Sequence, residues 1–182
     1  MAKFKSSPSL VIMVHILSIT LVLPKRASSA LAERARVEGV SIEELAAELL
    51  LEKLEAADPD AKAELHLKLC ERYLSEAEAY LSKGDYVQAS EKAWGAASQA
   101  VKAIAAKRGA ILRSHRDLWK FITELSKERR EWKLIEMFHI ANSLHVNFYE
   151  NWLTAEAVER GIGAVKLFVK KLIKLLEQTA ET

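Results

Sequence analysis

The residue types best suited to chemistry gather in one dodecapeptide, residues 141–152, which contains all three asparagines of the chain. Asparagine is a poor helix former because its side chain competes for backbone hydrogen bonds, so three in one predicted helix need a local reason. On a helix the polar side chains of this stretch fall on two faces. One face carries Asn142, His145, Tyr149 and Trp152, and the other carries Asn147, Glu150 and Asn151. We therefore predict that the dodecapeptide is the polar centre of the molecule.

His145 could act as a general base, because the 2′-hydroxyl of RNA must lose a proton when the adjacent phosphodiester is cleaved. Asn142 and Tyr149 would then orient the phosphate. The alternative is a half-buried histidine hydrogen-bonded to a neighbouring helix, with Asn142 and Tyr149 completing a structural network. The other face offers three candidates to bind a ligand or to bridge two protomers, namely Asn147, Glu150 and Asn151.

No metal or cofactor site is predicted. His139 and His145 are six residues apart, which places them on opposed faces of a helix, unlike the i, i+4 spacing of zinc ligands. The sequence has no glycine-rich phosphate loop, no CxxC pair and no acidic metal-binding motif. The single cysteine, Cys70, falls in an apolar stripe and is expected to be a buried, inert thiol.

A second candidate site is the window from Lys92 to Arg116, which contains no acidic residue. The N-terminus of the helix predicted after this loop would also favour anions, because its first backbone N–H groups are free. Phosphate or an RNA backbone is one natural partner. The alternative is a solvated loop whose cations complement the dipole of the preceding helix. The candidate binding residues around the loop are Lys107, Arg108, Arg113 and Arg116.

Length and composition indicate one sizeable globular domain with a small accessory segment in 182 residues. A net charge of +2 is too small to imply a nucleic-acid partner by itself. Few Asn and Gln residues beside many Glu, Lys and Arg residues are typical of a heat-adapted organism.

Capping residues and glycines divide the chain into predicted helices. Ser41, Asp58, Asp85, Ser114 and Thr154 are the expected N-caps. The predicted helices span residues 25–38, 42–57, 59–82, 86–107, 115–127, 131–152 and 155–178. Short turns between the later helices favour a mainly α fold, with an up-down antiparallel bundle of four or five helices over residues 58–182.

The first thirty residues allow two interpretations. Lys3 and Lys5 before an apolar run at 10–23 would suit a signal peptide, but His15 interrupts the run and Lys25 follows it. The run is also short for a membrane span. We therefore expect a cytoplasmic protein without a membrane partner, in which residues 1–12 are disordered or upstream sequence.

The competing interpretation is a strand followed by two helices. Residues 16–23 alternate in polarity and end at Pro24, and a helix, Gly39-x-Ser41 and a second helix follow. This order over residues 13–57 resembles a ribbon-helix-helix module, which implies an obligatory dimer with paired strands. The outward pair would be Ser18 and Thr20, small hydroxyls that specify few bases. The resemblance therefore predicts a dimerisation segment rather than a DNA reader.

Several short motifs between residues 60 and 178 resemble the archaeal PaREP repeat-family proteins, which are similar in turn to HEPN domains. These motifs are Gly84-Asp85-Tyr86, His115-Arg116-Asp117-Leu118, Leu144-His145-x-Asn147-Phe148-Tyr149-Glu150 and a final Lys-rich helix. The resemblance implies a dimeric HEPN-like helical bundle. It also implies either a metal-independent ribonuclease or a toxin paired with a nucleotidyltransferase partner.

The ribonucleases of that superfamily carry an arginine four to six residues before the active histidine. His145 matches the histidine, but Phe138, His139 and Ile140 occupy the positions open to the arginine. The missing arginine favours a binding role over catalysis. We expect a dimeric interaction module that binds nucleic acid or a protein partner of the toxin–antitoxin type. The alternatives are a metal-independent endoribonuclease that uses His145 and a purely structural oligomerisation protein.

Overall fold

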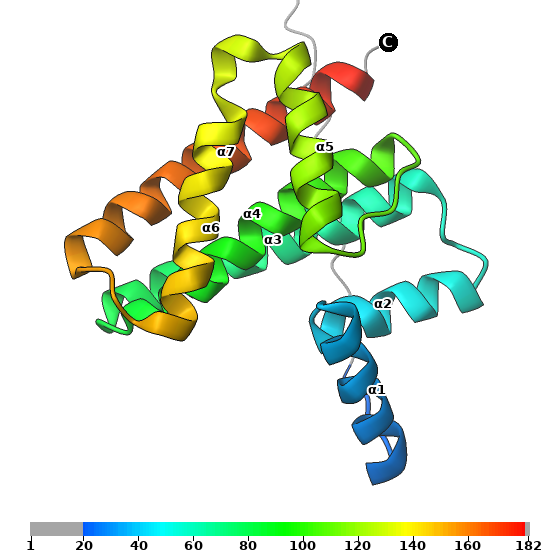
Figure 1. Ribbon diagram of the computed structural model, residues 1–182. Helices are drawn as coiled ribbons and strands as arrows, with labels where there is room; N and C mark the ends of the chain where they lie inside the picture. The colour runs from blue at the N-terminus through cyan, green and yellow to red at the C-terminus, as the bar shows by residue number, and fades with distance from the viewer. Residues whose placement is uncertain (1–19, 181–182) are drawn as a thin grey trace, which may run out of the picture.

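The protein is mainly helical, as predicted. The computed structural model describes the backbone of residues 20–180 and the side chains of residues 20–178 (Figure 1). Within this part of the chain there is no strand. The helices are α1 (Lys25–Glu38), α2 (Ile42–Lys53), α3 (Pro59–Ser82), α4 (Tyr86–Lys107), α5 (His115–Glu128), the 3-10 helix η1 (Arg130–Trp132), α6 (Leu134–Glu150) and α7 (Ala155–Ala180).

The N-terminal strand expected at 16–23 is not observed in the part that can be described. Residues 20–23 are neither helix nor strand, and residues 16–19 lie outside the described residues, as does the segment 1–12. Helix α1 begins at Lys25 directly after Pro24 and ends at Gly39, whose φ of 66° is left-handed. A ribbon built from residues 16–23 therefore stays a prediction.

The helix starts predicted from Ser41, Asp58, Asp85, Ser114 and Thr154 are confirmed, because these capping side chains make the expected bonds. The Ser41 hydroxyl accepts from the backbone N–H of Glu44, and the Asp85 carboxylate accepts from that of Gln88. Two other helix boundaries were predicted wrongly. Helix α2 stops at Lys53 rather than 57, and α6 begins at Leu134, after η1, rather than at 131. At both places a residue with left-handed φ interrupts the pattern, Glu55 and Lys133.

Helix α4 lies at the centre of the fold, in contact with α3, α6 and α7, while α5 covers α6 and α4 (Figure 1). Small side chains let these neighbours approach closely. Gly95 on α4 faces the Tyr73 ring of α3, where an added Cβ would lie 3.0 Å from the ring. The buried alanines of α4 are Ala89, Ala93, Ala96, Ala97, Ala100, Ala103, Ala105 and Ala106.

The N-terminal helices are arranged differently from the rest. Helix α2 packs on α3 and α1 packs on α2, so that α1 projects away from the other helices (Figure 1). Several large apolar side chains of this segment are exposed, including Val37 and Leu54, each 72% exposed. No helix within residues 20–180 combines the length and the apolar character needed to cross a lipid bilayer.

Candidate functional site

Asn147 has a structural role within its own chain. Its side chain is fully buried, and its Oδ1 accepts hydrogen bonds from the backbone N–H groups of Trp152 at 3.0 Å and Leu153 at 2.8 Å. Its Nδ2 donates to the Ser90 hydroxyl of α4 at 3.0 Å. A side chain with no exposed surface cannot touch an external ligand, so this structure replaces the predicted binding role of Asn147 with a capping role.

The remaining polar residues of that face end the helix. Asn151 adopts a left-handed φ of 48° and caps α6, with its backbone N–H bonded to the Asn147 carbonyl. Glu150 and Asn151 are exposed. On the opposite face Asn142 is half-buried, and no hydrogen bond of its side chain is found within residues 20–178. The asparagines are therefore explained largely by the sharp end of α6.

His145 and Tyr149 do line a pocket, which has a volume of about 390 Å³. The pocket lies between α4, the start of α5, α6 and the turn after α1, whose Gly39 and Ser41 also line it. Trp94 of α4 forms its floor, with His115 of α5 stacked on the indole at 5.4 Å between centroids and an interplanar angle of 14°. The His145 ring lies 5.0 Å from the indole and 5.1 Å from His115.

Two further groups define the environment of His145. Its Nδ1 lies 3.0 Å from a carboxylate oxygen of Glu91. Because a carboxylate only accepts, Nδ1 carries a proton, and in the neutral form of the ring Nε2 is left to accept or bind. The Tyr149 ring contacts the imidazole edge-on at 5.3 Å and is itself 68% exposed, so it stands at the mouth of the pocket.

His115 is exposed, yet it is part of the ring cluster. The pKa of His115 is below its ordinary value, mainly because the ring is partly buried and secondly because His145 lies close to it. Near neutral pH this imidazole is therefore uncharged and offers a flat ring and one lone pair to the pocket.

Most of the predicted basic surface is neutralised by acidic residues from other helices. Distances of 2.5–2.8 Å join the charged atoms of these ion pairs. Lys107 and Arg108, two of the predicted binding residues, belong to them, so their charges are not free for a phosphate chain. The pairs are Lys92–Glu76, Lys102–Glu44, Lys107–Asp60 and Arg108–Glu128.

The carboxylate of Asp117, in the first turn of α5, bonds to the two residues just before this helix, near the expected anion site. Asp117 accepts hydrogen bonds from the backbone N–H of Arg113 at 3.2 Å and from the Ser114 hydroxyl at 2.8 Å. Those bonds hold the pKa of Asp117 below its usual range. The guanidinium groups of Arg113 and Arg116 have no ion pair with any described residue, and only Arg113 lines the pocket.

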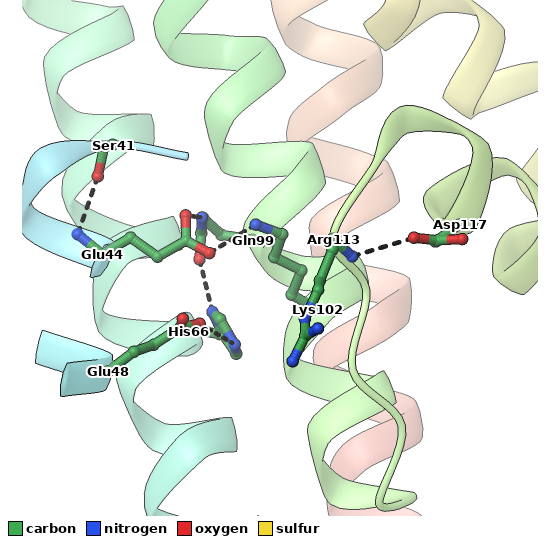
Figure 2. A network of polar contacts seen from close by, with 8 residues as sticks. All are labelled: Ser41, Glu44, Glu48, His66, Gln99, Lys102, Arg113 and Asp117. Carbon is green, nitrogen blue, oxygen red and sulfur yellow. Dashed lines mark hydrogen bonds and ion pairs between the residues drawn. The ribbon is translucent and has the colours of Figure 1, made fainter. Parts of the chain in front are cut away.

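A buried polar network next to the pocket was not predicted. Glu44 of α2 accepts from the Gln99 amide at 2.6 Å and from the Lys102 ammonium at 2.5 Å, and His66 Nδ1 lies 2.8 Å from the Gln99 carbonyl oxygen (Figure 2). Glu48 stands one turn after Glu44. The pKa of Glu48 is raised, mainly by burial and secondly by the negative charge of Glu44. The network borders a second pocket of about 290 Å³.

One sequence signal could have revealed this network. Gln99 and Lys102 are three residues apart inside the alanine stripe of α4, where long polar side chains need buried partners. Ser41 at the N-cap and Glu44 three residues later have the spacing of a capping box. The Ser41 half of that box exists, but the carboxylate turns inward to α4 instead.

The fold and the site define a mainly helical protein with an aromatic and histidine-lined pocket on its central helix. Residues 65–169, more than half of the chain, match the archaeal PaREP1/PaREP8 family, and the chain belongs to that family. A crystal structure of a Sulfolobus solfataricus protein is similar, with 28% sequence identity, a TM-score of 0.53, and coverage of 59% of this chain and 96% of the other. No curated protein matches the chain.

Proposed function

We propose that this protein is a HEPN-like interaction module that binds single-stranded RNA in the pocket around His145. The observation that carries the proposal is the cluster of Trp94, His115 and His145, whose ring centroids lie 5.0–5.4 Å apart in a pocket that Arg113 also lines. Flat rings next to a cation are what an unstacked base and its phosphate require.

The size and access of the pocket support one nucleotide as its occupant. A volume of about 390 Å³ is within the range of small-ligand sites. Tyr149 and His115 are exposed, so a base can reach them without a rearrangement of the core. Stacking on such rings contributes roughly 1–3 kcal/mol for each base.

The ion pairs of the basic window determine what kind of binding to expect. Among residues 20–178, Arg113 and Arg116 alone of that window lack an acidic partner, and of these two only Arg113 lines the pocket, so few counterions would be released from RNA. For the single phosphate contact of Arg113 the slope of log K against log salt should be roughly −0.7. Recognition would depend on stacking more than on charge, unlike the strongly basic surface that the sequence suggests.

Fluorescence anisotropy with a labelled single-stranded RNA tests this proposal. Arg113→Gln should weaken binding about tenfold and reduce the salt slope by about 0.7. Arg116→Gln is the matched control, since it removes an equal charge from a neighbouring residue outside the pocket. No binding at micromolar protein, or equal losses in the two variants, would reject the pocket as the RNA site. Equal binding of labelled DNA would show that the 2′-hydroxyl is not recognised.

A second candidate function is metal-independent cleavage of RNA, and the contact between His145 and Glu91 favours it. A carboxylate on Nδ1 orients the ring and stabilises the imidazolium that forms when Nε2 accepts a proton. His145 would take the proton of a 2′-hydroxyl as that oxygen attacks phosphorus, and the leaving 5′-oxygen would take a proton from water. Arg113 would hold the phosphate in place of the arginine that is missing from α6.

Incubation of RNA with the protein in EDTA tests this second function. His145→Ala should abolish cleavage, whereas His139→Ala should not, because His139 lies on the same helix against Trp119 and outside the pocket. Cleavage that survives in His145→Ala, or that is absent from the unaltered protein, would remove the enzymatic candidate.

The predicted homodimer is part of the proposal and is supported by the exposed apolar residues of α1 and α2. Light scattering after gel filtration should give the mass of a dimer, and the double variant Val37→Glu, Leu54→Glu should give a monomer with unchanged helix content. A dimer without RNA binding would favour the purely structural role. A partner of the toxin–antitoxin type and a cytoplasmic location are further expectations of the HEPN-like proposal.

A further inference from the structure

The buried network between α2 and α3 brings together three side chains with metal-binding atoms. Glu44, Glu48 and His66 each offer one ligand atom, and these atoms lie within 4.8 Å of one another. Glu44 and Glu48 are four residues apart, so they leave the same face of α2 toward His66 on α3 (Figure 2). This cluster lies outside the pocket of His145, apart from the shared Glu44.

The hydrogen bonds of Gln99 fix the protonation of His66. The Gln99 Nε2 donates to the Glu44 carboxylate at 2.6 Å, since a carboxylate can only accept. The Gln99 carbonyl oxygen therefore faces His66, and the contact of 2.8 Å requires a proton on Nδ1. A neutral His66 then has its lone pair on Nε2. Metal-binding histidines show this same arrangement, with the second ring nitrogen donating to a carbonyl oxygen.

The free Nε2 atom of His66 points at an acceptor rather than a donor. The side chain is only 8% exposed, and Nε2 lies 4.0 Å from a Glu48 carboxylate oxygen. Burial keeps the pKa of His66 below its ordinary value, which favours the neutral ring. The Nε2 of His66 and a Glu48 carboxylate oxygen thus face each other 4.0 Å apart, too far for a hydrogen bond, and a cation between them would bind to both.

We propose that Glu44, Glu48 and His66 bind a divalent transition-metal ion of the Zn²⁺ type. One imidazole and two carboxylates suit such an ion, whereas Mg²⁺ and Ca²⁺ prefer oxygen ligands alone. The adjoining pocket of about 290 Å³ gives an entry path and room for water as a further ligand. Lys102, bonded to Glu44, would oppose the ion's charge, so micromolar rather than tighter affinity is expected.

The ion would connect the N-terminal helices to the main body. Two of its ligands come from α2 and one from α3, and the Glu44 side chain also lines the pocket of His145. Metal binding would therefore stabilise the wall of that pocket without taking part in any chemistry there.

Titration of the chelator-treated full chain with Co²⁺, followed by its visible absorption and by calorimetry, tests the site. We expect one ion per chain, displaced by Zn²⁺. Glu48→Gln should weaken binding by at least about tenfold. Glu52→Gln should leave binding unchanged, since Glu52 lies one turn further along α2, lines the same pocket and is outside the cluster. Urea unfolding of each metal-free variant would show that Glu48→Gln folds normally.

Three results would overturn the proposal: no binding, equal binding by Glu48→Gln, or binding that only His115→Ala removes. The last would place the ion among the rings of the other pocket. A further measurement uses the unaltered chain, so it does not depend on whether a variant folds. In NMR of ¹⁵N-histidine protein, Zn²⁺ should shift Nε2 of one histidine whose Nδ1 stays protonated, and unshifted histidine signals would refute the site.

Discussion

Replacing Asn147 with alanine should destabilise the fold by about 2–4 kcal/mol, although alanine is the better helix former. The substitution removes the acceptor of two backbone N–H groups, those of Trp152 and Leu153, and one partner of the buried Ser90 hydroxyl. These two bonds are part-buried, so each donor left without a partner should cost about 1–2 kcal/mol, the lower part of the range for buried groups, and the intrinsic helix preference returns only about half a kcal/mol. In a chain of this length the unfolding temperature should fall by roughly 5–15 °C.

Urea unfolding followed by circular dichroism measures this loss, with Asn142→Ala as the matched control. Asn142 lies on the same helix, and its side chain has no hydrogen bond within residues 20–178, so its replacement should change the free energy of unfolding by less than about 0.5 kcal/mol. Equal effects of the two substitutions would refute the capping role of Asn147. The polar dodecapeptide would then need another explanation.

Three further predictions concern the body of the fold. Gly163→Ala should stabilise the protein by about 0.5–1 kcal/mol in urea unfolding, because an added Cβ at this exposed helix position meets no other atom. Gly95→Ala should not stabilise it in the same experiment, because the added Cβ would crowd the Tyr73 ring. NMR titration should give His115 a pKa below 6.5. The free energy of unfolding that the neutral His115 ring contributes above pH 6.5 should then be lost as the pH falls through that lower pKa. Burial raises the pKa of Cys70 to about 12, so thiol reagents at pH 8 should react only after unfolding.

The helix starts could be predicted because each depends on a few neighbouring residues. The Asp58 carboxylate accepts from the backbone N–H groups of Asp60 and Ala61 behind Pro59, as its sequence context indicates. The start of α6 and the end of α2 were harder to place. Both boundaries lie beside a left-handed residue other than glycine, Lys133 and Glu55, and no local pattern indicates that backbone conformation.

The candidate site could be predicted only in part, because its members come from distant segments. His145 and Tyr149 are one turn apart and were expected together, but Trp94 and His115 join them only through the packing of α4 and α5 against α6. The basic window shows the same limit. Its cations all fall within residues 92–116, whereas the acids that neutralise them lie on other helices, as with Arg108 and Glu128.

Glu44 connects the N-terminal helices to both pockets, and this gives them a role besides the proposed dimerisation. A buried carboxylate is stable only with partners, and both of its partners, Gln99 and Lys102, lie on α4. Helix α2 is therefore docked in one register on α3 and α4, which places Gly39 and Ser41 in the wall of the His145 pocket. Any partner that binds the exposed apolar residues of α1 and α2 would act on this wall, so assembly and ligand binding should be thermodynamically linked.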